Sequence, residues 1–331
     1  MKLKVLIKLC VFIMVVSISN YALCEECHIS DVYSGVFNTV AIDATCVNMS
    51  NNICELKTKI IDIDSNTLIS AIKKYSTIDF ENTSPKEGDH HSKKYINYSF
   101  DVVNAQLEYV PSRYITNDVE QIYFVDLSQD EVGQTFFNKS KNSPNCNYTY
   151  AEAEKMVSDF LSIIVPNMRY DFEIYPFILE DESNGGYVIF AHAIWRGISG
   201  CRVQNDPENQ GEIEFRINNS GIYFMRGNVN WIVEEEQARN SNVLDVYDIE
   251  NTLLENVDLL GEIIETNERI IEIRPIYYRA LTLPVNTRIL MPAYAIYSSF
   301  EDGNIEQKAI CCIDAITGEI IKNNDPFDQN G

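Results

Sequence analysis

Three stretches of the chain place apolar residues at the spacing of an amphipathic helix. The clearest begins at Thr149, which forms a capping box with Glu152, and it ends before Pro166. Within it, apolar residues recur at positions 153, 156, 157, 160, 161 and 164. A second stretch follows the N-cap residues 64–66, and a third runs from Val246 to Leu260. The pattern therefore predicts three helices, each with one buried face.

Between these helices lie short runs with the alternation, or the continuous apolar character, of β-strands. Turn residues at 184–186 and at 219–221 each separate two such runs and predict two hairpins. A further hairpin, centred near residue 50, is predicted to join the runs 39–47 and 53–63. The segment from 270 to 321 is predicted to form three strands at the end of the chain.

Helices interspersed among hairpins, without a β-α-β rhythm, indicate an α+β fold. We expect repeated small modules, each an antiparallel β-sheet (a meander) packed under one amphipathic helix. The polar, linker-like stretch 128–147 separates the two expected domains. The expected division is a signal peptide (1–24), an N-terminal α+β domain (25–140), and a C-terminal α+β domain (148–331) of two modules, 148–240 and 241–322.

The first residues have the organisation of a secretory signal peptide. Lys2, Lys4 and Lys8 precede an apolar run from Leu9 to Ile18. Ten helical residues rise about 15 Å, about half of the hydrocarbon core of a bilayer. Cleavage after residue 19 or residue 24 would give an extracytoplasmic protein, either secreted or attached to the outer face of the membrane; an uncleaved signal anchor is the alternative.

Cys24 is a weak candidate for lipid attachment. Bacterial lipoprotein processing favours a small residue directly before the modified cysteine, and Leu23 occupies that position. Either an uncleaved signal or a lipid on Cys24 would be an N-terminal anchor, and contact with the membrane is expected only through such an anchor.

The chain of 331 residues is strongly acidic, with 26 Lys and Arg against 49 Asp and Glu and a formal charge of −23. Loss of the three lysines of the signal would leave 23 basic against 49 acidic residues, or −26. No basic patch offsets this charge, so nucleic acid is excluded as a partner. An apolar content of 45% is typical of a folded protein.

The nine cysteines fit an oxidising compartment, in which disulfides persist. The hairpin predicted near residue 50 would place Cys46 opposite Cys54, which makes them a disulfide candidate; two separately buried thiols are the alternative. Cys311 and Cys312 are adjacent on a predicted strand, so their side chains should point to opposite faces.

Two further patterns carry metal or haem ligands but lack the right context. Cys24-Glu-Glu-Cys27-His28 matches the haem-attachment motif, yet it adjoins the signal peptide and precedes β-like sequence. Asp89, His90 and His91 lie in a polar stretch, 81–94, that is predicted to be a surface loop. We expect no metal and no cofactor.

No common catalytic motif is present in the sequence. Cys201 with His192 could form a nucleophile pair, but His192 lies on an apolar strand and is more simply a core or edge histidine. Abundant carboxylates leave an acidic site open. We therefore name no catalytic residue.

The end of the chain carries a family resemblance. Leu290-Met-Pro-Ala-Tyr-Ala-Ile-Tyr297 precedes Ala309-Ile-Cys-Cys-Ile-Asp-Ala-Ile-Thr-Gly-Glu-Ile-Ile321. Asp314 and Thr317 can bond to their own turn, and Gly318 can adopt a positive φ. This pattern resembles the closing hairpin of PepSY-like modules and of YycH/YycI-like extracytoplasmic regulatory proteins of Gram-positive envelopes. The whole chain also resembles uncharacterised secreted or lipoprotein-type proteins.

The resemblance implies a non-enzymatic role, such as restraining a protease or modulating a sensor. The first hypothesis is thus an exported binding or regulatory protein of the cell envelope that recognises a protein or peptide. The alternative is an extracytoplasmic hydrolase with an unrecognised acidic or Cys-based site. A deep pocket with converging polar groups would favour the hydrolase, and a shallow groove or an open sheet edge would favour the binding protein.

Overall fold

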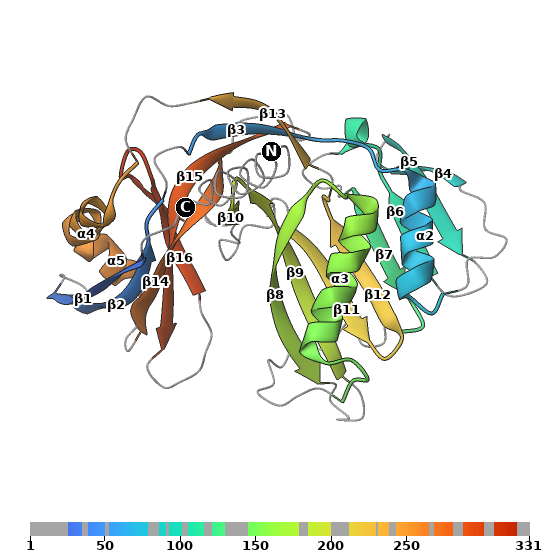
Figure 1. The fold of residues 1–331 in the computed structure, drawn as a ribbon, viewed down its shortest axis with the longest axis horizontal. Helices are drawn as coiled ribbons and strands as arrows, with labels where there is room; N and C mark the ends of the chain where they lie inside the picture. The colour runs from blue at the N-terminus through green and yellow to red at the C-terminus, as the bar shows by residue number, and fades with distance from the viewer. Residues whose placement is uncertain are drawn as a thin grey trace, which may run out of the picture.

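The fold is described from a computed structural model of the full chain (Figure 1). The described residues are 26–34, 39–49, 53–78, 86–90, 93–100, 105–115, 121–129, 145–178, 185–199, 212–229, 231–237, 243–264, 268–280, 287–300 and 308–322. The predicted signal peptide, Cys24, His91 and Cys201 lie outside them. Two antiparallel-rich sheets, which we call sheet A and sheet B, and four α-helices make an α+β fold in this part of the chain.

Sheet A joins strands from both ends of the chain. Its main path is β1-β2-β14-β15-β16-β17, and β3 pairs with both β15 and β13. All its pairings between described strands are antiparallel except that of β2 with β14. The strands are β1 (Glu26–Ser34), β2 (Thr39–Val47), β3 (Glu55–Ile60), β13 (Trp231–Gln237), β14 (Glu268–Ala280), β15 (Thr287–Phe300), β16 (Lys308–Asp314) and β17 (Ile320–Lys322).

Sheet B is built from strands that lie closer together in the sequence. Its order is β10-β9-β11-β12-β7-β6-β5-β4, with β8 paired to β9. The strands are β4 (Lys86–His90), β5 (Lys93–Phe100), β6 (Ala105–Tyr109), β7 (Ile122–Asp126), β8 (Arg169–Ile178), β9 (Gly185–Trp195), β10 (Ile198–Ser199), β11 (Glu212–Asn218) and β12 (Gly221–Gly227). A short 3-10 turn, η1 (Ser112–Tyr114), lies between β6 and β7.

The predicted helix starts are confirmed. α2 (Ser65–Tyr75) is capped by the carboxylate of Asp64, and α3 (Tyr150–Ile164) begins with the reciprocal capping box of Thr149 and Glu152. The third predicted helix forms two pieces, α4 (Val246–Glu255) and α5 (Val257–Ile263), which meet at Asn256. Helix propensity alone did not reveal this break.

Helices α2 and α3 pack on one face of sheet B (Figure 1). The ring of Phe160, on α3, makes edge-on contacts with Tyr75 of α2 and with Phe215 of β11, at centroid distances of 6.2 and 5.7 Å. Phe160 and Phe215 are both fully buried. The apolar stripe predicted for α3 is therefore the contact between the helix layer and the sheet.

Helices α4 and α5 bury Ile249, Leu253 and Leu260 in the core that lies beside sheet A. Tyr294 of β15 is at the centre of this region and is fully buried. Its hydroxyl accepts a hydrogen bond from the backbone N–H of Met49 (3.0 Å) and donates one to the carbonyl of Leu244 (3.1 Å). The side chain of Tyr294 thus links β15 to the segment after β2 and to the segment before α4.

The two sheets meet where β9 and β10 approach β14. The rings of Trp195 on β9 and Tyr277 on β14 lie edge to face, 6.4 Å apart. An ion pair between Arg196, which follows β9, and Glu236 of β13 makes a second connection. The core of sheet A consequently includes residues from the end of sheet B, among them Ala193 and Ile198.

The hairpin predicted near residue 50 is wrong. A strand has two edges for hydrogen bonding, and those of β2 are taken by β1 and β14. Strand β3 is likewise paired on both edges, with β13 and β15. In the pairing of β1 with β2, Cys46 lies opposite Cys27 rather than opposite Cys54. The Cys46–Cys54 disulfide therefore loses the geometric argument on which it rested.

Two other predictions need correction or restatement. The stretch 81–94 was expected to be a loop, but Lys86–His90 forms β4, paired with β5. Its polar composition is typical of a short edge strand. Neither sheet is confined to one expected domain, because β2 pairs with β14 and β7 pairs with β12 across the expected boundary.

Most of the other local predictions are confirmed. The antiparallel pairs β8–β9 and β11–β12 form, and Gly221 has a φ of +85° at the turn of the second. The turn predicted at 184–186 is misplaced, because Gly185 and Gly186 belong to β9 and pair with β8. After β16, the carboxylate of Asp314 accepts hydrogen bonds from the backbone N–H groups of Ile316 and Thr317, and Gly318 has a φ of +74°. Cys311 and Cys312 are buried in different apolar clusters, as expected for opposite faces.

No helix within the described residues has the length and apolar character needed to cross a membrane.

Candidate functional site

A cluster of charged side chains lies at the junction of the two sheets. Strand β8 supplies Asp171, Glu173 and Tyr175, which alternate along the strand and so share one face. In the register of β8 with β9, Asp171 lies opposite His192, and Glu173 lies one diagonal step away. The helix-covered face of β9 carries Ile189 and Ala191, so His192 is on the face away from helices α2 and α3.

Glu173 is the centre of this cluster. Its Oε2 accepts a hydrogen bond from the hydroxyl of Tyr175 (3.1 Å) and lies 3.9 Å from Nε2 of His192. The side chain of His192 is only 4% exposed, whereas that of Glu173 is 32% exposed. Among the described residues, Nε2 of His192 has no hydrogen-bond partner. The separation between this nitrogen and Oε2 of Glu173 is longer than a hydrogen bond.

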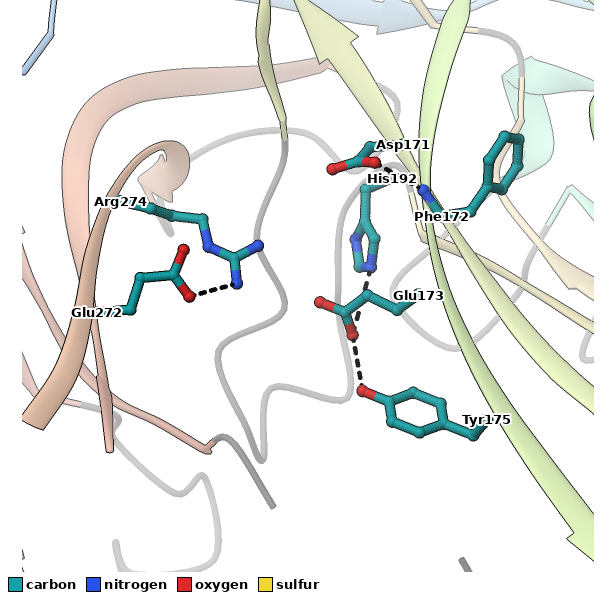
Figure 2. Close-up of polar contacts among 7 residues, drawn as sticks. All are labelled: Asp171, Phe172, Glu173, Tyr175, His192, Glu272 and Arg274. Atoms are coloured by element: carbon teal, nitrogen blue, oxygen red, sulfur yellow. Dashed lines mark hydrogen bonds and ion pairs between the residues drawn. The ribbon is translucent and has the colours of Figure 1, made fainter. Parts of the chain in front are cut away.

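The neighbouring strand β14, in sheet A, faces this group with two further charges (Figure 2). Nη2 of Arg274 donates a hydrogen bond to Oε2 of Glu272 (3.1 Å), and both side chains are 29% exposed. The guanidinium of Arg274 lies 4.3 Å from the ring centroid of Tyr297 on β15, which fixes its orientation. The junction thus brings together ionisable groups from strands about a hundred positions apart in the sequence.

The environment keeps Glu173 ionised. Burial raises the pKa of Glu173, but the imidazole of His192, the hydroxyl of Tyr175 and the positive charge of Arg274 outweigh burial and lower this pKa to about 2. At neutral pH the carboxylate of Glu173 is therefore negatively charged and can attract a positive group.

Carboxylates predominate among the side chains drawn in Figure 2, where Asp171, Glu173 and Glu272 accompany the guanidinium of Arg274. No group of three or more His, Cys, Asp or Glu side chains in the described ranges is arranged to hold a metal ion. These carboxylates attract a positively charged group more strongly than an anion.

The residues singled out from the sequence are not gathered in one place. His192 is at the junction, but Cys201, the other half of the nucleophile pair considered for it, lies outside the described residues, as does Cys24. His28 of the haem-like motif lies on β1 and contacts Asp43 of β2 at 3.0 Å. The stretch that was predicted to be a surface loop forms the strand β4 at Asp89 and His90.

Sequence reasoning missed Glu173 and Arg274. A signal was present for part of the site, because Asp171, Glu173 and Tyr175 alternate with apolar residues and His192 interrupts an apolar strand. Arg274 carried no such signal, since its approach to Glu173 depends on how the two sheets pack.

The comparisons with known proteins show the fold alone. No family model matches the chain, and no curated protein matches it. The chain is similar in structure to an uncharacterized protein from Eubacterium rectale ATCC 33656, with a TM-score of 0.61 and 13% sequence identity over 86% of this chain and 90% of that chain. At this identity, the likeness shows a similar overall fold and nothing about function.

Proposed function

We propose that the chain is an exported, non-enzymatic binding or regulatory protein of the cell envelope, and that the junction cluster holds a positively charged group of a protein or peptide partner. The observation that carries this proposal is the carboxylate of Glu173, which is kept ionised yet is one-third exposed. The net charge of −23 supports it, because an acidic surface attracts basic partners over distance.

The proposed contact is with the exposed part of Glu173. A lysine ammonium or an α-amino group of the partner would pair there with the Glu173 carboxylate, whose side chain is 32% exposed. The hydroxyl of Tyr175 points at the same carboxylate and donates a hydrogen bond to it (Figure 2). A positive group in this position would lie between the two sheets, so binding would favour one arrangement of the junction.

The proposal retains several predictions from the sequence. Export, attachment through an N-terminal anchor, and regulation of a protease or sensor, as the YycH/YycI-like and PepSY-like resemblance implies, stay predictions. The repeated modules also stay a prediction; each sheet carries a pair of helices rather than the one helix that was expected.

The test is binding of a fluorescein-labelled octalysine peptide to the purified chain, followed by fluorescence anisotropy. Replacing Glu173 with Gln removes the central charge with little change in shape, and we expect about tenfold weaker binding, which corresponds to about 1.4 kcal/mol. Glu255→Gln, at an exposed position on α4, is the matched control because it changes the net charge equally. Affinity should fall as salt concentration rises.

If Glu173→Gln and Glu255→Gln weaken peptide binding equally, the binding is non-specific electrostatic attraction, and the proposed site is refuted. Cleavage of the peptide, detected by mass spectrometry of the same samples, would instead support the alternative hydrolase.

A further inference from the structure

We propose that Cys27 and Cys46 form a disulfide that fastens the N-terminal strand β1 to sheet A. The inference does not depend on the proposed function. It rests on the pairing of β1 with β2, which differs from the pairing that the sequence pattern predicted.

The backbone places the two cysteines directly opposite each other. In the antiparallel register, Glu26 lies opposite Val47, Cys27 opposite Cys46, and His28 opposite Thr45. Directly opposed residues in an antiparallel pair have Cα atoms about 4.5–5.5 Å apart. A disulfide requires a Cα separation of about 4.4–6.8 Å, so this register permits the bond without movement of the strands.

The two thiols differ in their accessibility to solvent and should therefore react in a fixed order. Cys46 is fully buried, whereas Cys27 is partly exposed and its sulfur lies 3.6 Å from Nδ2 of Asn48. Burial, and in second place the nearby charge of Cys27, raise the pKa of the Cys46 thiol to about 12. The more accessible Cys27 should therefore react first with an external disulfide, since only a thiolate attacks efficiently.

The oxidant in this step is a small disulfide such as glutathione disulfide. The Cys27 thiolate attacks one of its sulfurs, which forms a mixed disulfide and releases one glutathione thiolate. The sulfur of Cys46 then loses its proton and attacks the sulfur of Cys27, which releases the second glutathione thiolate. The two cysteines lose two electrons and two protons in total, and glutathione disulfide gains them as two molecules of glutathione.

This bond would matter most for β1, because β1 lies at the end of the main strand path of sheet A. Its described pairing is with β2 alone, and β2 in turn pairs with β14 from the far end of the chain. The disulfide would close a loop with 18 residues between the two cysteines. It would also occupy Cys27, one of the two thiols that the haem-like motif would need.

Peptide mapping of the full chain, equilibrated with glutathione disulfide and then alkylated, tests this pairing. Cleavage after Asp and Glu yields one peptide of residues 27–31 that contains Cys27 and another of residues 44–55 that contains both Cys46 and Cys54. We expect these two peptides to be linked in the wild type and in Cys54→Ser, and not to be linked in Cys46→Ser.

A bond between Cys46 and Cys54, or alkylation of both Cys27 and Cys46 after this treatment, would overturn the proposal. A second measurement covers the case in which Cys46→Ser fails to fold. Reduction should lower the melting temperature of the wild type by about 5 °C, and it should leave that of Cys27→Ser unchanged. An equal response of the wild type and Cys27→Ser to reduction would likewise refute the pairing.

Discussion

The two sheets differ in how their strands are drawn from the chain. In sheet B, β4, β5, β6 and β7 follow one another, and β8–β9 and β11–β12 are hairpins. In sheet A, the early strands β2 and β3 pair with the late strands β14 and β15. Local pairings need only short loops to close, whereas pairing of distant strands must offset a larger loss of chain entropy. Sheet A therefore depends more on specific cross-links between its strands than sheet B does.

The largest effect is expected in the apolar layer of sheet B. Phe160→Ala removes a fully buried ring that contacts both α2 and β11, and it should lower the free energy of unfolding by about 3–5 kcal/mol. Chemical denaturation measures the loss. Tyr150→Ala, on the exposed side of the same helix, is the control and should have little effect. Hydrogen exchange that accelerates equally in both sheets would mean that they unfold as one unit, against the contrast drawn above.

The second effect tests the cross-links of sheet A. Tyr294→Phe keeps the buried ring but leaves the N–H of Met49 and the carbonyl of Leu244 without their partner, and it should cost about 1–3 kcal/mol. Tyr277→Phe is the matched control, because the hydroxyl of Tyr277 makes one described hydrogen bond, to the carbonyl of Cys54. Thermal unfolding of the two variants compares them. A loss no greater for Tyr294→Phe would show that this double contact is unimportant.

The third effect is local to the helix layer of sheet B. Thr149→Ala removes the hydroxyl that accepts the N–H of Glu152, and it should reduce stability by about 1 kcal/mol. Thr149→Ser keeps the oxygen and should restore most of the loss. Faster hydrogen exchange should be confined to the first turn of α3. Equal stability of the Ala and Ser variants would argue against the capping box.

The last effect concerns the junction between the sheets and appears only in acid. The pKa of Glu173 is about 2 in the folded chain, against an ordinary value of 4.5. A lowered folded-state pKa contributes stability that is fully present above the unfolded value and is lost as the pH falls through the folded value. The wild type should therefore lose part of its stability between about pH 4.5 and pH 2, as measured by denaturation at each pH. Glu173→Gln should flatten this part of the profile; an unchanged profile would contradict the lowered pKa.

The sequence predicted the features that depend on near neighbours. The N-cap of Asp64, the capping box at Thr149 and the turn at Asp314 are each decided within a few residues, and all three are confirmed. The prediction of a hairpin near residue 50 was wrong because β1 and β14 occupy the two edges of β2. The sequence around residue 50 gives no information about pairing with β14, which is distant in the chain. The site was missed for the same reason. Glu173 and His192 lie on the paired strands β8 and β9, but Arg274 approaches them only because the two sheets pack together.

The parallel contact between β2 and β14 has a consequence for the growing chain. Synthesis proceeds from the N-terminus, so β1, β2 and β3 are complete long before their partners β14 and β15 exist. Sheet B can assemble during that interval, since β12 precedes all of β13 to β17. The early strands meanwhile present unsatisfied backbone groups that invite pairing with other chains.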